Sequence, residues 1–480
     1  MSDSPVKKKV NAKKIAIITV FAVILTLIVA IAVLVWTSRD ILMWNNSHPI
    51  RIAGTSLDTS GLSGFAADAL YLVQTIEQVH PIFVIDGYLP ENYEAIRDEF
   101  LLYAQGDITR QEFIFASWRY ITALRDGHMT GLQLLSSPQE TLSGDLLSLS
   151  WLVQDDNLYL QEQDGYLAKV LEIGSVSPHD VFALVDYYVY SENPVDRNRI
   201  LALHSRYSGF IELAGGAISD NTTVITVEDN GEVRTITANF DFLQQRAEEN
   251  DNEPEFIIRY EFIDDIFFID FRMFVPDDGI DETIYAIERA IENGTRKFII
   301  DLRGNGGGNS WHGQRLLHAM GITLPNFGAV RRFSDLFIDT AMLTTLERLQ
   351  VRLISPFARG QIFSPSTATA SNPNEVFVSV LTDRFTYSSA TMMAVWVQDG
   401  GFGNIIGGIS SNAPSAFGDM LRFELPYSEI GIRVSHARFL RPDANADQSA
   451  LKPDILIDPA YAIYVALDYL RNLGGLYVTP

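Results

Sequence analysis

The sequence predicts an α/β protein that has a helical N-terminal region and is preceded by one long apolar helix. Three observations predict this class. Residues 15–36 form an apolar run without a charged side chain. Between about 66 and 125, apolar residues recur at helical spacing. After about 255, short apolar runs typical of buried strands alternate with helical patterns, which indicates an α/β core.

The N-terminal segment is predicted to anchor the chain in the cell membrane. A helix of about 20 apolar residues spans the hydrocarbon core, whereas the apolar core of a cleaved signal usually has only about 7–15 residues. No small-x-small cleavage site follows Trp36, and five lysines lie within residues 7–14. We therefore expect a cytoplasmic basic tail over 1–14, a transmembrane signal anchor over 15–37 and an extracytoplasmic body, in a single-pass topology. A cleaved signal is the alternative.

Three regions are expected between this anchor and the α/β core. A polar stretch rich in Ser, Thr, Gly and Asn predicts a linker over 38–62. Residues 63–135 are predicted to form a small helical domain, with helices near 91–104 and 110–125 after a first one from about 66. Residues 145–245 have a mixed α/β pattern, with strands within 151–160 and 222–227 and helices near 178–189 and 195–205.

The region 255–475 carries the alternating strands and helices of the predicted core. We expect strands at 256–262, 266–271, 297–302, 376–381 and 404–407, and helices at 281–293, from about 310, at 388–398 and at 460–472. Two alternating runs near 419–424 and 429–434 predict an antiparallel pair at an edge.

Composition excludes several kinds of site. The chain has no cysteine, so disulfides, a cysteine nucleophile and cysteine-bound zinc are excluded. The formal net charge is −24, which argues against a nucleic-acid partner because such binding needs clustered Lys and Arg. Solubility is the simplest role of this acidity. His312 and His318 have no carboxylate at metal-ligand spacing and are interpreted as structural, so no metal or cofactor is expected.

Three short motifs carry candidate chemistry, and each has a structural alternative. Residues 301–309 (DLRGNGGGN) follow a predicted strand, and such a glycine turn presents free N–H groups to an anion or is simply a tight turn. Its spacing and its lack of a P-loop lysine argue against a nucleotide. Ser388 begins a predicted helix, as a cap or as a nucleophile. His128, in the Asp-Gly-His run at 126–128, is a base or a structural histidine.

Together these motifs resemble the C-terminal processing (tail-specific) serine peptidases, in the branch that includes the core of the tricorn protease. Residues 301–308 resemble that family's Asp-Leu-Arg-x-Asn-x-Gly-Gly signature, and 381–390 (LTDRFTYSSA) resemble its nucleophile segment. Residues 404–407 and 452–455 resemble the next strand and the closing Glu-Pro-Asp-Ile element. The resemblance covers roughly 63–470 and implies a ClpP/crotonase-like ββα superhelix.

The resemblance also implies a site. It makes Ser388 the nucleophile, His128 the general base and Asp447 the acid that orients the base, as in other Ser-His-Asp triads. The oxyanion would be held by the N–H of Ser389 and by one N–H from the glycine turn, with Gly306 and Gly307 as candidates.

Two departures from the family pattern remain. Ala413 stands where many members have a lysine base, and Thr391 stands where the family usually has Glu. We expect a membrane-anchored extracytoplasmic serine endopeptidase that acts on a protein or peptide; no oligomeric state is predicted. A catalytically silent, membrane-tethered peptide-binding relative is the alternative. A crotonase-type acyl-CoA enzyme is disfavoured because its cofactor is cytosolic.

Overall fold

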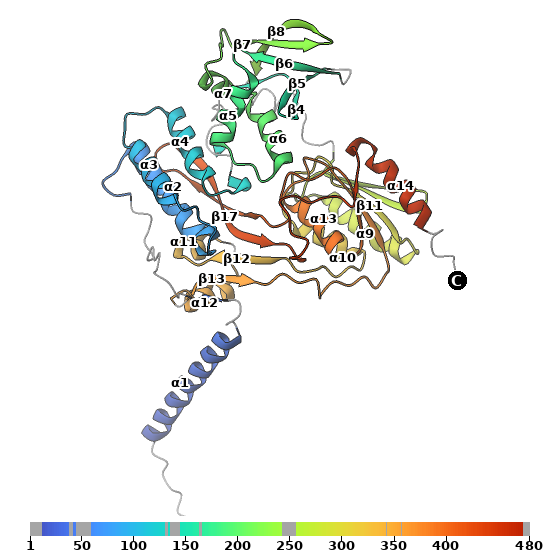
Figure 1. Ribbon diagram of the computed structural model, residues 1–480. Coiled ribbons are helices and arrows are strands. Elements are labelled where there is room, and N and C mark those ends of the chain that lie inside the picture. Colours follow the sequence, from blue (N-terminus) through green and yellow to red (C-terminus); the bar gives the residue numbers. More distant parts are fainter. Residues whose placement is uncertain are drawn as a thin grey trace, which may run out of the picture.

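The computed structural model describes residues 12–37, 42–44, 59–129, 133–134, 145–162, 166–241, 256–341, 343–356 and 358–473. Within them, three six-stranded sheets and the surrounding helices form the body of the molecule, and α1 (Ala12–Thr37) extends away from it (Figure 1). The mixed α/β class predicted from the sequence is confirmed.

The first sheet contains the predicted α/β core. Its strand order is β18-β15-β14-β11-β10-β9, and all neighbours are parallel except β9 and β10. The strands are β9 (Ile258–Ile263), β10 (Ile266–Phe271), β11 (Lys297–Asp301), β14 (Phe377–Thr382), β15 (Gly403–Gly407) and β18 (Ile455–Leu456). Their near-continuous apolar character follows from burial of both faces.

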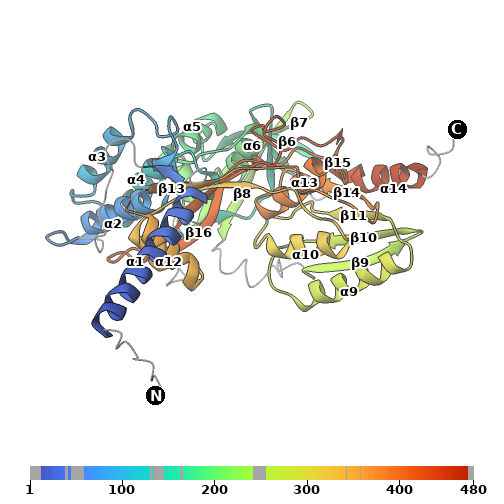
Figure 2. The same cartoon turned by 90° about the horizontal axis from the view of Figure 1, so that it is seen from below.

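Helices cover both faces of this sheet. The helices α9 (Asp278–Glu292), α10 (Trp311–Ala319) and α13 (Ser389–Asp399) share one apolar core with it, and α14 (Ala462–Asn472) shares a second core with the opposite face (Figure 2). In α9 the buried residues Ile280, Thr283, Ile287 and Ala290 recur every three or four positions, so one stripe faces the sheet.

The second sheet is antiparallel and packs against the N-terminal helices. Its order is β1-β13-β12-β17-β16, and β2 also pairs with β17. The strands are β1 (Leu42–Trp44), β2 (Gln133–Leu134), β12 (Gly328–Arg332), β13 (Ala358–Phe363), β16 (Phe417–Glu424) and β17 (Ile430–Leu440). The predicted antiparallel pair near 419–424 and 429–434 is confirmed as β16 and β17.

The helical region consists of α2 (Gly64–Val79), α3 (Tyr93–Tyr103) and α4 (Arg110–Thr122), with the short helices α11 (Asp335–Thr340) and α12 (Thr345–Ile354) nearby. Leu72 and Ile76 of α2 lie in the same apolar core as Ile432 and Val434 of β17. A capping box begins α4: the side chain of Thr109 accepts the N–H of Glu112, and the side chain of Glu112 accepts the N–H of Thr109.

The third sheet belongs to the middle region. Its order is β3-β8-β7-β6-β5-β4, and α5 (Pro178–Tyr188), α6 (Pro194–His204) and α7 (Ser208–Leu213) pack beside it. The strands are β3 (Leu146–Leu147), β4 (Trp151–Gln154), β5 (Asn157–Gln161), β6 (Leu167–Ile173), β7 (Thr222–Asp229) and β8 (Glu232–Asp241). Its hairpin pairing is wholly antiparallel.

Two predictions for the N-terminus meet different outcomes. Residues 12–37 are helical, but among the described residues no helix is both long and apolar enough to cross a membrane. Within the predicted linker, residues 42–44 form β1 and pair with β13. This pairing joins residues far apart in the chain, for example Leu42 and Gln361, which are 319 positions apart, so local polarity could not reveal it. The remaining linker residues 38–41 and 45–58 lie outside the described part of the chain.

Candidate active site

The two strand-to-helix motifs lie side by side because their strands are neighbours. β11 pairs in parallel with β14, and Asp301 lies opposite Leu381 in this register. Parallel strands end at the same edge of a sheet, where ligands of open α/β folds bind. The glycine turn after β11 and the serine turn after β14 therefore meet at this edge.

Hydrogen bonds join these two turns. Asp383 Oδ1 accepts the N–H of Gly304 at 3.1 Å and that of Thr386 at 3.0 Å. Thr386 Oγ1 donates to the carbonyl of Leu302 at 2.9 Å, and the N–H of Tyr387 donates to that of Asn305 at 3.0 Å. The position of the serine turn is thus set by the neighbouring loop.

Ser388 has a strained backbone at the start of α13. Its φ is 53° and its ψ is −120°, a combination that is rare for a residue with a Cβ. Its N–H donates to Asn412 Oδ1 at 2.9 Å, and its side chain makes no helix cap. The capping alternative is therefore wrong, and the Oγ is free to point away from the helix.

His128 reaches Ser388 from the N-terminal helical region. Its Nε2 lies 3.1 Å from Ser388 Oγ, although 260 residues separate the two in the chain. The backbone N–H of His128 donates to Asp126 Oδ1 at 2.8 Å, and the other oxygen of Asp126 lies 3.0 Å from His80 Nε2. Asp126 is fully buried and thereby fixes the short turn that presents His128.

The glycine turn approaches the serine very closely. Gly307 has φ +96°, and a Cβ there would lie 2.8 Å from Ser388 Cβ and 2.9 Å from Ser389 N. However, the N–H of Gly307 donates to Asn305 Oδ1 at 2.8 Å, so it is engaged within its own turn. This engagement corrects the prediction of Gly307 as an oxyanion donor. The N–H groups of Ser389 and Gly306 have no recorded acceptor among the described residues and remain candidates.

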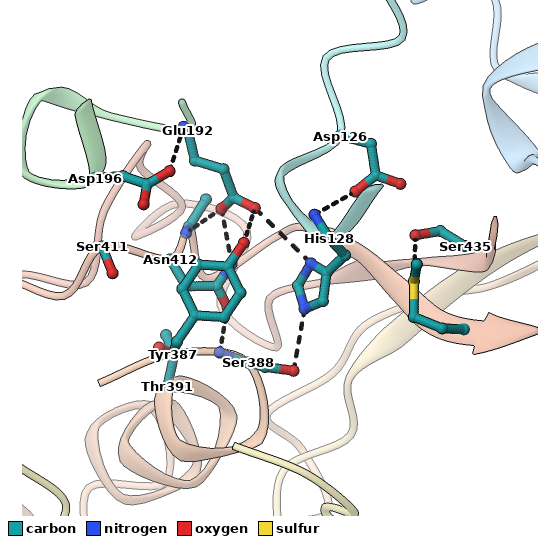
Figure 3. A network of polar contacts seen from close by, with 12 residues as sticks. Asp126, His128, Glu192, Asp196, Tyr387, Ser388, Thr391, Ser411, Asn412 and Ser435 are labelled. Carbon is teal, nitrogen blue, oxygen red and sulfur yellow. Dashed lines mark hydrogen bonds and ion pairs between the residues drawn. The ribbon is translucent and has the colours of Figure 1, made fainter. Parts of the chain in front are cut away.

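The structure does not bring Asp447 to His128. Asp447 is exposed, in the loop after β17, where it lines a cleft of about 450 Å³ with Tyr88, Arg438 and Glu192. Instead, Glu192 Oε1 lies 3.9 Å from His128 Nδ1, and both side chains are mostly buried, at 7% and 13% exposure (Figure 3). The prediction of Asp447 relied on its place in the family's sequence pattern, which does not fix where an irregular loop projects. Glu192 was missed because nothing in the mixed pattern of 145–245 distinguishes it.

Both departures from the family pattern are accommodated locally. Thr391 is buried on α13, and its Oγ1 donates to the carbonyl of Thr386 at 3.3 Å, so the hydroxyl is satisfied. Ala413 stands in the place expected for a lysine base, and its N–H donates to Glu192 Oε2 at 2.7 Å. The backbone at this position thus binds the buried carboxylate of Glu192.

Burial governs the electrostatics of these groups. Burial lowers the pKa of His128, although the carboxylates of Asp126 and Asp196 oppose this effect. Burial would raise the pKa of Asp126, but hydrogen bonding to His80 holds that pKa below its ordinary value. His128 is therefore a neutral base over more of the pH range than an exposed histidine.

Among the described residues, no group of three or more His, Asp or Glu side chains could hold a metal ion. His312 is buried at the start of α10, and the pKa of its ring is lowered by burial.

The chain is similar to known peptidases both in sequence and in structure. The family model described as peptidase family S41 matches residues 266–457. No curated protein sequence matches the chain. The solved structure of mature CPAF is 14% identical, covers 86% of this chain and 97% of its own, and superposes with a TM-score of 0.54.

Two further solved structures are similar. Mature CPAF complexed with lactacystin is 15% identical, with coverage of 86% and 98% and a TM-score of 0.55. The photosystem II D1 C-terminal processing protease is 12% identical, with coverage of 83% and 94% and a TM-score of 0.44. At these identities the CPAF structures establish a shared fold. The match of residues 266–457 to the family model confirms the resemblance of this segment to the C-terminal processing peptidases of family S41.

Proposed function

We propose that the chain is an active serine endopeptidase in which Ser388 is the nucleophile and His128 the general base. The observation that carries this proposal is the 3.1 Å contact between Ser388 Oγ and His128 Nε2, made by residues 260 positions apart. A serine and a histidine brought together at a strained turn have the geometry that nucleophilic catalysis requires.

The reaction proceeds in two stages. Ser388 Oγ attacks the carbonyl carbon of the scissile peptide while His128 Nε2 accepts its proton. The tetrahedral intermediate collapses when His128 returns this proton to the leaving amine, which leaves an acyl-serine ester. Water then attacks the ester, again with His128 as base, and the acid product and free Ser388 are released.

The oxyanion of each tetrahedral intermediate would be bound at the start of α13. The N–H of Ser389 is one of the first free N–H groups of this helix, where the helix dipole favours negative charge. Gly306 is the candidate for the second donor, since the N–H of Gly307 is engaged by Asn305. One such donor contributes about 3 kcal/mol to lowering the barrier.

The ClpP/crotonase-like ββα superhelix implied by the motifs belongs to the same proposal. The order β9, β10 and α9, followed by β11 and α10, supports it because a strand unit and a covering helix repeat. A protein or peptide substrate follows from membership of the peptidase family.

Hydrolysis of an unstructured protein tests this function. The full chain should cleave such a substrate, while Ser388→Ala and His128→Ala should each lower kcat by about 10³-fold or more. A folded parent chain that leaves every protein and peptide substrate intact would instead support the silent binding protein. Activity that persists in Ser388→Ala would show that another residue is the nucleophile.

Membrane anchoring through residues 15–37 remains part of the proposal. The apolar side chains from Ile17 to Val33 that the structure describes are about half exposed or more, as expected for a helix that lies in lipid. In cells, the chain should resist extraction by alkaline carbonate, and external protease should degrade the body but spare an N-terminal tag. Release of the full chain by carbonate would contradict a transmembrane anchor.

A further inference from the structure

We propose that Glu192, from the middle region of the chain, is the positioning carboxylate of His128, so that Ser388, His128 and Glu192 act together. This inference rests on the proposed peptidase function and assigns the acid of its site. It also gives a role to the region 145–245, to which the sequence assigned none.

The unpaired ring nitrogen of His128 is the first observation that points to Glu192. Nε2 of His128 is taken up by Ser388 Oγ, and Nδ1 is buried with no hydrogen-bond partner among the described residues. A buried ring nitrogen without a partner is costly, so an acceptor close to it matters. Glu192 Oε1 lies 3.9 Å from Nδ1, and a shift of about 1 Å would make a normal hydrogen bond. Such contacts commonly tighten only when substrate binds.

Glu192 is also connected to the nucleophile. Its Oε2 accepts the side-chain amide of Asn412 at 2.7 Å, and Asn412 Oδ1 in turn accepts the N–H of Ser388 at 2.9 Å. Tyr387, the residue before the nucleophile, donates its hydroxyl to Glu192 Oε1 at 3.0 Å. One carboxylate therefore contacts both the base and the strained turn (Figure 3). A residue placed only to fill space would not need this set of directed bonds.

The backbone around Glu192 is clamped to the catalytic region. The next residue, Asn193, caps α6 by accepting the N–H of Asp196 at 3.0 Å. Its amide nitrogen donates to the carbonyl of Ser411 at 2.9 Å and to that of Ser449 at 3.0 Å. Asp196 accepts the N–H of Glu192 itself at 3.0 Å. The carboxylate is therefore held by a helix start rather than by a free loop.

Charged and titratable groups from several elements surround Glu192. Burial, with Asp196 also contributing, raises the pKa of Glu192 to about 7, although the bonds from Ala413, Asn412 and Tyr387 oppose this. His128 and Tyr190 lie beside it, and the same cleft is lined by Tyr88, Arg125, Arg438 and Asp447. An imidazolium formed at His128 during the reaction would favour the carboxylate form of Glu192. The pair then stabilises charge where the reaction creates it.

Matched neutral variants distinguish the two carboxylates near the site. The probe is a fluorophosphonate, and the measurement is the second-order rate of labelling at Ser388 between pH 5.5 and 9 in the full chain. We expect Glu192→Gln to lower this rate by about 100-fold or more and to change its pH dependence. Asp447→Asn should leave the rate and its pH profile close to those of the parent. The reverse order would overturn the proposal and restore Asp447 as the acid.

A second measurement does not depend on activity. In the Ser388→Ala background, the imidazole of His128 is titrated by NMR, with His128→Gln to assign its signals. Glu192→Gln should lower the His128 pKa measurably, because the imidazolium loses its anion, whereas Asp447→Asn should not. If the parent fails to label but this response is seen, the peptidase function fails while the pairing stands. An unchanged His128 titration in Glu192→Gln would overturn the pairing, whether or not the parent labels.

Discussion

Three neighbouring features hold Ser388 in its strained conformation. Its N–H is bound by Asn412, the following turn begins α13, and Gly307 leaves no room on the remaining side. Strain of this kind costs about 1–3 kcal/mol and persists only where the surroundings impose it. The strained conformation of Ser388 therefore requires a glycine at position 307, where a side chain would collide with the serine turn.

A pair of glycine substitutions separates these two effects. Gly304 and Gly307 both have positive φ, but a Cβ at Gly304 meets only Arg272 Nη1 at 4.0 Å, whereas at Gly307 it meets the Ser388 turn at 2.8 Å. Gly304→Ala should cost about 1 kcal/mol of stability and leave most activity. Gly307→Ala should lower fluorophosphonate labelling by about 100-fold or more. Equal labelling of the two variants would contradict the account.

The raised pKa of Glu192 makes a prediction about stability. The pKa is about 7 in the folded chain against an ordinary 4.5. Between these values the folded state binds more protons than the unfolded state, so this group stabilises the fold below pH 4.5, and its contribution is lost as pH rises through 7. The full loss is about 3 kcal/mol.

Glu192→Gln removes this pH dependence. We expect the free energy of unfolding of Glu192→Gln minus that of the parent to increase from pH 5 to pH 8, which means that the variant becomes relatively more stable. The difference between the two proteins cancels the titration of groups that do not interact with Glu192. Chemical denaturation at several pH values measures it, and a difference that stays constant with pH would contradict the burial of a titrating carboxylate at this position.

At the scale of elements, the catalytic sheet was largely predictable. Its strands are short apolar runs and its helices have one apolar stripe, so periodicity located β10, β11, β14, α9 and α13 to within a few residues. The motif residues Ser388 and His128 could also be chosen, because their types and spacing resemble a known family.

What could not be predicted depends on packing between distant segments. Glu192 lies between α5 and α6, in a segment whose local pattern shows only a helix start, and it becomes a site residue because Asn193 bonds the loops near Ser411 and Ser449. The position of Asp447 in the cleft likewise reflects the path of an irregular loop. Hydrophobic periodicity in the sequence predicts neither the position of Glu192 nor that of Asp447.

Asn193 offers a test of how the α6 start supports the site. Asn193→Asp keeps the helix cap but loses the amide that donates to the catalytic loops, so labelling at Ser388 should fall with a small change in stability. Ser177→Ala is the control: Ser177 caps α5 by accepting the N–H of Asp180 at 3.2 Å, and its loss should cost about 1 kcal/mol without slowing labelling. Slower labelling in the control, or unchanged labelling in Asn193→Asp, would contradict a specific role for this clamp.

At the scale of the whole molecule, the apolar cores cross the boundaries predicted from the sequence. The sheet of β12, β13, β16 and β17 comes from the region 255–475, yet Leu425, Ile430, Ile432 and Val434 share one core with the N-terminal helices. The residues of the proposed site are likewise distributed, since His128 comes from the helical region and Glu192 from the middle region. The three regions therefore assemble one site.

This architecture predicts unequal effects of truncation. Residues 255–480 alone would expose the apolar face of β16 and β17, so they should aggregate or lack a cooperative thermal transition. Removal of residues 1–58 deletes α1 and the short edge strand β1 and should leave the main transition in place. Circular dichroism on heating measures both, and cooperative unfolding with labelling of residues 255–480 would contradict a shared core.

The most direct test of the central claim is the site of covalent labelling. The full chain is treated with a fluorophosphonate in its native state, and the modified residue is identified by mass spectrometry, with heat-unfolded chain, Ser388→Ala and His128→Ala alongside. We expect one adduct, on Ser388, that requires the native fold and is lost in both variants. An adduct on another serine, or native protein that remains unlabelled, would contradict Ser388 as an activated nucleophile.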